Sequence, residues 1–270
     1  MILTIRHVLP ELARLNNMNE TTTTRGLNNM YYEPMTTITR VKLVRRFLRH
    51  LAVDPLDIYD QYAGQVFCSG LSKQIAFREF LINDSVSDEV IAELGTMCAD
   101  SKLSSFRDSR TPEEYATELM LGWIVEDAVC FALSNKTTSA HLAGSDRFRD
   151  FLPAEKITTG QDIIVSNDEH AIGVEIMCDY KNWWLKHDKA DLRGNKLNRL
   201  ESSNSYILGI SLQQPAFFFA SLAYPGLLTF TEKAWHEKYG KPARGICGVS
   251  KNLKPVRTMV SSIEEAVLNN

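Results

Sequence analysis

The chain has 270 residues, of which 44% are hydrophobic and 23% charged, with a formal net charge of −3 at pH 7. These values are ordinary for a globular protein, and no apolar run reaches the roughly 20 residues that a membrane-spanning helix needs. The small net charge does not exclude a nucleic-acid partner, because acidic surface elsewhere can hide a basic groove in the total. The five cysteines are odd in number, widely spaced and without a CxxC pair, which predicts reduced thiols in a cytoplasmic protein.

The first hundred residues show helical periodicity. Between Val41 and Leu51 apolar residues recur on one side of a predicted helix, and basic residues lie on or near the other side. Ser87 is a suitable N-cap for a further helix. We therefore expect residues 1–105 to form a mainly helical N-terminal region. The basic residues of the first helix are Arg40, Lys42, Arg45, Arg46, Arg49 and His50.

A more strongly signalled helix begins at Thr111. Thr111 and Glu114 form a capping-box pattern, and Pro112 occupies the first turn. The helical pattern continues to about Leu133. Gly122 lowers the helix propensity, so we expect it to let a neighbouring element pack closely.

Beyond this helix the apolar period changes from helical to alternating. Residues 160–165 and 171–181 are predicted to be the two strands of a hairpin. A helix over 190–201 and an apolar strand over 205–213 are predicted to follow. This order indicates an α/β core with a mixed sheet over residues 106–215. Residues 216–270 are then a C-terminal extension.

Asp162 and Glu175 face each other if the hairpin turn has two residues. A turn at residues 168–169 sets Asp162 directly opposite Glu175 and leaves most apolar residues on the opposite face. Opposed carboxylates are destabilising unless a proton or cation relieves their repulsion, and Mg²⁺ takes oxygen ligands. A slipped register, or a solvated sheet face that carries both acids, is the alternative to a metal site.

The acid pair and its setting resemble the PD-(D/E)xK nuclease superfamily. Asp162 and Glu175 lie thirteen positions apart on a hairpin between two helices, and the order of elements from about 111 to 213 is similar to that family's core. The preceding helix carries Gly122 and Glu126 in a G-xxx-E arrangement, which the family often shows. Glu126 is then a candidate ligand for a metal-bound water, or else a buried structural glutamate. The resemblance covers less than half of the chain.

The sequence departs from this family at the lysine. The pattern asks for lysine two residues after the glutamate, where this chain has Met177. Lys181 shares the strand face with Glu175, but its backbone is about 20 Å further along a straight strand. Lys196, in the following predicted helix, is the other candidate. Asp179 with Lys181 forms a second D-x-K pattern, which keeps the lysine and makes Asp179 an alternative metal ligand.

Two basic segments are candidates for contact with DNA phosphates. One is the helix that carries Arg40 to His50, and a solvated helix face is its alternative. The other is a glycine-containing segment over 241–257 with few acids. Its cations are Lys241, Arg244, Lys251, Lys254 and Arg257. For the paired Trp183 and Trp184 we expect a place in the core.

The resemblance implies magnesium-dependent hydrolysis of phosphodiester bonds in double-stranded DNA. A nuclease core of this size without helicase motifs is similar to type II restriction endonucleases, which usually act as homodimers. The GK[ST] phosphate-loop signature is absent, so no nucleotide cofactor is expected. A non-catalytic DNA-binding or assembly protein on a degenerate nuclease fold is the alternative that Met177 favours, and a helical interaction protein is a third.

Overall fold

The structure is a computed structural model whose described residues lie between residues 35 and 269. The described residues are 35–63, 70–83, 85–100, 111–134, 137–145, 147–149, 152, 156–158, 160–203, 205–223, 226–231, 234–236 and 241–269. Residues 1–34 of the expected N-terminal region therefore lie outside the described part. No helix among the described residues is long and apolar enough to cross a membrane.

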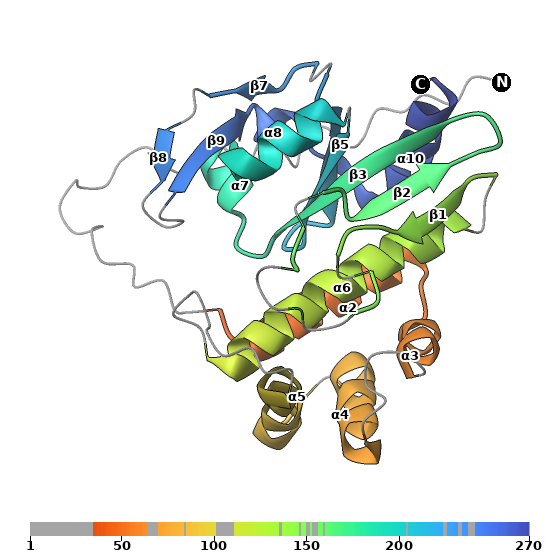
Figure 1. Cartoon of the computed structure of the whole chain (residues 1–270), viewed down its shortest axis with the longest axis vertical. Coiled ribbons are helices and arrows are strands. Elements are labelled where there is room, and N and C mark those ends of the chain that lie inside the picture. The colour runs from red at the N-terminus through yellow and green to blue at the C-terminus, as the bar shows by residue number, and fades with distance from the viewer. Residues whose placement is uncertain are drawn as a thin grey trace, which may run out of the picture. The chain divides into compact units, whose positions relative to one another are not determined.

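A central sheet of mixed strand direction organises the described part of the chain (Figure 1). Its strands lie in the order β1-β2-β3-β5-β6-β10, and only β3 and β5 run parallel among these neighbours. The mixed α/β class predicted from the alternating periods is therefore confirmed. The strands span Ser139–Leu142 (β1), Ile163–Ser166 (β2), Ala171–Asp179 (β3), Tyr206–Ser211 (β5), Ala216–Ser221 (β6) and Lys254–Pro255 (β10).

Helices cover one face of this sheet. Helices α2 and α6 run side by side beneath it in Figure 1, and α10 joins them on the same core cluster. Alternate residues of β3 from Ile172 to Cys178, and Tyr180 directly after the strand, pack on this cluster, as the period of two predicted. The helices span Thr37–Leu51 (α2), Pro55–Ala63 (α3), Leu71–Ile82 (α4), Asp88–Asp100 (α5), Pro112–Ser134 (α6) and Met259–Leu268 (α10).

The opposite face of the sheet is covered by short helices and a second, smaller sheet. In that sheet β9 pairs with β4, β7 and β8. A second apolar cluster, which includes Trp184, Leu197 and Phe218, fills the space against the central sheet. The elements span Trp183–His187 (α7), Lys189–Arg193 (β4), Gly194–Ser202 (α8), Thr229–Phe230 (β7), Ala234–His236 (β8) and Lys241–Cys247 (β9). The chain closes through α9 (Val249–Asn252), β10, the 3₁₀ turn η2 (Val256–Thr258) and α10.

Several local predictions are confirmed by hydrogen bonds. Thr111 Oγ1 accepts the N–H of Glu114 at 3.2 Å, and a Glu114 carboxylate oxygen accepts the N–H of Thr111 at 3.0 Å. This is the reciprocal capping box at the start of α6. The N–H of Val90 donates to Ser87 Oγ at 3.3 Å, as expected of an N-cap.

Three local predictions are wrong, wholly or in part. Residues 190–193 are strand β4 rather than the start of the helix, because they pair with β9, a strand fifty residues further along the chain. A Cβ added at Gly122 would meet no atom within 4 Å, so this glycine does not mark a close approach. Trp184 is buried, but Trp183 is 46% exposed and lies outside the core.

Candidate active site

Asp162 and Glu175 lie opposite each other at the start of the β2–β3 hairpin. The observed register pairs Val165 with Ile172 and Ile163 with Val174, so the two-residue turn predicted from the sequence is confirmed. The N–H of Asp162 donates to Val174 O at 2.9 Å, which extends the ladder by one residue. The ladder therefore places the Asp162 backbone directly beside Glu175.

The Glu175 carboxylate is buried and electrostatically strained. The residue is only 1% exposed, and its Oε2 atom has no hydrogen-bond partner within the described residues. Burial, and then the neighbouring Asp162 carboxylate, raise the pKa of Glu175 to about 8. Asp162 is tied down by the main chain, since its Oδ2 accepts the N–H of Ile176 at 2.7 Å. The two acids are therefore fixed side by side, and at neutral pH they favour a bound proton or cation.

Lys196 reaches this acid pair from α8. Leu197 and Leu200 bury one side of that helix in the second apolar cluster, which orients α8 over the central sheet. The Lys196 ammonium forms an ion pair with Glu175 Oε1 and lowers the pKa of that carboxyl. Of the two lysines that the sequence offered, Lys196 is the one that the fold brings to Glu175.

Met177, Asp179 and Lys181 occupy the rest of this strand face. Met177 packs against the second apolar cluster beside Gly209 of β5. Asp179 is buried, and its two carboxylate oxygens accept the N–H groups of Lys181 and Trp184, each at 2.9 Å. These bonds fix the turn from β3 into α7, and the Lys181 side chain is exposed to solvent. The Asp179 carboxylate is thus used by the main chain.

Glu126 is engaged by an arginine that sequence reasoning did not single out. The Arg149 guanidinium lies 2.6 Å from Glu126 Oε2 and 3.1 Å from Asp127 Oδ1, and Arg149 is 3% exposed. Arg149 also has a left-handed backbone, with φ at 58°. An isolated arginine in an irregular segment gives no sequence signal of this role. The network gives Glu126 a structural partner on the helical side of the sheet.

The basic residues of α2 are largely used inside the fold. Arg45 is 7% exposed and donates to Phe80 O at 2.7 Å, so it is not available to a DNA surface. Arg46 donates to Leu212 O and Gln213 O at 2.6 and 2.5 Å, and Arg40 forms an ion pair with Glu118. The exposed basic side chains of this helix are Lys42, Arg49 and His50.

The second basic segment is split between a strand and a turn. Arg244 on β9 forms an ion pair with Glu201 at 3.1 Å and donates to Thr231 O at 2.9 Å. Lys251, Lys254 and Arg257 are exposed. The side chain of Lys241 lies outside the described part.

The two carboxylates suit Mg²⁺, which keeps waters and substrate phosphates among its ligands, better than they suit a metal ion whose ligands are all protein side chains. Among the described residues no group of three or more His, Cys, Asp and Glu side chains is arranged to hold a metal. Mg²⁺ is commonly bound by one or two carboxylates and completed by waters and substrate phosphates. Asp162 and Glu175, with the unpartnered Oε2 of Glu175, meet that requirement.

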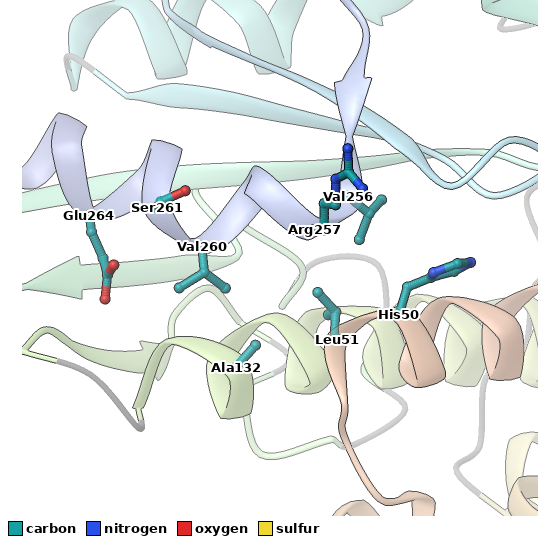
Figure 2. Close-up of a pocket in the computed structure, with 8 residues that line it drawn as sticks. All are labelled: His50, Leu51, Ala132, Val256, Arg257, Val260, Ser261 and Glu264. Atoms are coloured by element: carbon teal, nitrogen blue, oxygen red, sulfur yellow. The ribbon is translucent and has the colours of Figure 1, made fainter. Parts of the chain in front are cut away.

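A pocket of about 300 Å³ lies on the other side of the central sheet from the acid pair. Figure 2 shows it between the end of α2, helix α6 and the start of α10. Leu51, Ala132 and Val260 contribute apolar lining, while His50, Arg257 and Glu264 contribute polar groups. Neither candidate acid nor Lys196 lines it, so this pocket is separate from the candidate active site.

Comparisons with known proteins identify no family for this chain. No family model and no curated protein matches it. Among solved structures, it is similar to Hjc, a Holliday junction resolvase from the archaeal hyperthermophile Archaeoglobus fulgidus. The TM-score is 0.33 with 13% sequence identity, over 50% of this chain and 92% of that one. A likeness at that TM-score carries no argument about activity, so the function is argued from the geometry of the site.

Proposed function

We propose that this chain is a magnesium-dependent nuclease that hydrolyses phosphodiester bonds in double-stranded DNA. The observation that carries this proposal is the fixed pair of acids, Asp162 and Glu175, with the Lys196 ammonium on Glu175. Folding alone gains little from a buried carboxylate that faces a second carboxylate, because both desolvation and repulsion oppose it. A site of this kind is expected where a cation and an anionic substrate meet.

Each of these residues has a definite role in the proposal. Asp162 and Glu175 would hold Mg²⁺, and the ion supplies a polarised phosphate and a more acidic bound water when present. Lys196 orients the attacking water and offsets negative charge that develops on the phosphate. Its ammonium would take the role that the resembling family gives to a lysine at the position of Met177.

The finer assignment within this proposal is a type II restriction endonuclease that acts as a homodimer. Each strand of a duplex needs one cut, and the described residues of this chain carry one acid pair of the proposed kind. Contacts from exposed cations such as Lys42, Arg49 and Lys251 would position the duplex without reading its sequence. A single-strand cut per binding event in the isolated protein would argue against the dimer.

The first experiment measures cleavage of supercoiled plasmid and of a mixed linear DNA substrate in the presence of Mg²⁺. Wild type is expected to give discrete fragments, and Glu175→Ala to lose at least about 100-fold of the rate, because general acid–base and metal sites commonly contribute this much. Lys181→Ala, on an exposed lysine of the same strand region, is the matched control and should cleave normally. Normal cleavage by Glu175→Ala would refute the site.

The second experiment asks which lysine serves the reaction. Lys196→Met is expected to lose activity, while the exchange Met177→Lys with Lys196→Met is expected to regain part of it. Residue 177 lies two positions from Glu175 on the same strand face, so a lysine there can take over the ion pair. A non-catalytic DNA-binding protein would instead bind duplex DNA and leave it intact in every variant, Met177→Lys included.

A further inference from the structure

Gly173 and Gln161 make a contact that only glycine allows. A Cβ built on Gly173 would lie 2.8 Å from Gln161 Nε2 and 2.9 Å from its Cγ, which is closer than real Cβ atoms approach. Gly173 is the third residue of β3, where its backbone is paired with Ile164 of β2. A glycine inside a strand often marks a place where another group must come close to the backbone. Here that group is the side-chain amide of Gln161.

The amide lies on the strand face that carries Glu175. Residues 172 and 174 of β3 point into the helical cluster, so the missing side chain of Gly173 would point the other way, beside Glu175. Two positions along a strand correspond to about 6.6 Å. Gln161 also directly precedes Asp162 in the chain. The Gln161 amide therefore lies on the same strand face as Glu175, at the position of Gly173, and belongs to the residue that precedes Asp162.

The chemistry of an amide suits a phosphate at this position. Within the described residues the structure assigns the Gln161 amide no hydrogen-bond partner, and the residue is half-buried. Two neighbouring carboxylates repel a phosphate, whereas an amide N–H donates to a phosphate oxygen without adding negative charge. A lysine here would compete with the cation for the carboxylates, and a neutral donor does not.

We propose that the Gln161 side-chain amide, held in place by the absence of a side chain at Gly173, is a phosphate subsite for the DNA strand at the acid pair. Nε2 donates a hydrogen bond to a non-bridging oxygen of the phosphodiester. This proposal rests on the proposed function, because it presumes that DNA lies across Asp162 and Glu175.

The test combines DNA affinity without metal and cleavage with Mg²⁺, for a double-stranded oligonucleotide. Gln161→Ala is expected to weaken binding about 3-fold to 10-fold and to raise KM more than it lowers kcat, from the loss of one phosphate contact. Gln161→Glu keeps the shape but adds a third carboxylate, so it should weaken binding further. A merely structural glutamine would leave the DNA affinity of the folded Gln161→Ala variant unchanged.

Gly173→Ala probes the same contact without touching either acid or the amide itself. The added methyl group displaces the flexible end of Gln161, so the variant should bind DNA as weakly as Gln161→Ala. The double variant should be no weaker than either single one, because both remove one contact. Gly122→Ala, where a Cβ meets no neighbour, is the matched control and should bind DNA normally. Thermal unfolding of each variant confirms that it is folded.

The outcomes separate this proposal from the proposed function. If Gln161→Ala, Gln161→Glu and Gly173→Ala bind and cleave like wild type while Glu175→Ala is inactive, the phosphate subsite is wrong and the nuclease assignment stands. If wild type never cleaves but binds duplex DNA with the expected order of variants, the subsite stands and the catalytic assignment fails. Loss of binding in Gln161→Ala but not in Gly173→Ala also overturns the subsite.

Discussion

At the scale of single residues, Glu175 concentrates the unusual electrostatics of this fold. Its carboxylate is buried beside Asp162, and Lys196 compensates only part of the resulting penalty. Removing Lys196 would leave the buried carboxylate without its counter-charge, which is costly in a low-dielectric site. Under the proposed function, the burial of Glu175 is explained by a bound cation and substrate rather than by the stability of the sheet.

The raised pKa of Glu175 predicts how stability changes with pH in the metal-free protein. Because the folded state holds a proton up to a pKa of about 8 and the unfolded chain releases it near the ordinary carboxyl pKa of 4.5, the folded state binds more protons between those pH values. The contribution of Glu175 to the free energy of unfolding is thus highest near or below pH 4.5, and it falls as the pH rises toward 8.

Urea unfolding from pH 5 to 8.5 with a chelator measures this slope. Glu175→Gln removes the titrating group, so the variant should lose less stability over that range than wild type, by at least about 1 kcal/mol. Glu169→Gln, in the exposed hairpin turn, serves as control and should follow wild type. Parallel curves for wild type and Glu175→Gln would show that the carboxyl is not held protonated.

At the scale of elements, we expect the substitution of glycine by alanine to have opposite effects on stability at two positions, Gly122 and Gly209. Gly122 lies inside α6 with no atom within 4 Å of an added Cβ, so Gly122→Ala should raise the free energy of unfolding by about 0.5–1 kcal/mol. A Cβ on Gly209 of β5 would lie 1.9 Å from the ring of Phe218, which is buried in the second apolar cluster. Gly209→Ala should therefore cost about 1–3 kcal/mol or more. Chemical denaturation of the pair measures both, and equal shifts would contradict this packing.

The elements also show which parts of the fold a sequence can reveal. The capping box at Thr111 and the register of Asp162 against Glu175 depend on neighbours a few residues apart or on a two-residue turn, and both were predictable. Strand β4 was not predicted, although Ala190 and Leu192 alternate with charged residues, because so short a run does not distinguish a strand from the start of a helix and its pairing partner is the distant strand β9. The choice of Lys196 over Lys181 likewise needed the path of α8 over the sheet. The Gln161 contact was missed although Gly173, a glycine on the face of Glu175, was its one sequence signal.

At the scale of the whole molecule, helices of the N-terminal half and the central sheet share one core. The first apolar cluster includes residues of α2, α4 and α6 as well as of β2, β3 and β5. The basic face of α2 helps to hold the helices on the sheet, because Arg46 of α2 donates hydrogen bonds to the carbonyl groups that directly follow β5. The basic residues of α2, which the sequence predicts to contact DNA, are therefore partly used as hydrogen-bond donors inside the fold.

We therefore expect a substitution of Arg46 to change the stability of the protein, whereas a substitution of a DNA-contact residue would change its affinity for DNA. Arg46→Ala removes charged donors from two carbonyl oxygens, Leu212 O and Gln213 O, and should lower the free energy of unfolding by about 1.5–3 kcal/mol. Lys42→Ala, on an exposed position of the same helix, should change it by less than about 0.5 kcal/mol. Urea unfolding followed by far-UV circular dichroism and by tryptophan fluorescence should give one coincident transition in both variants, because the helices and the sheet share a core.

The salt dependence of DNA binding completes the comparison of these two variants. Lys42→Ala should reduce the slope of affinity against salt concentration, and Arg46→Ala should leave that slope unchanged. A normal unfolding curve for Arg46→Ala together with weakened DNA binding would return this arginine to the DNA surface.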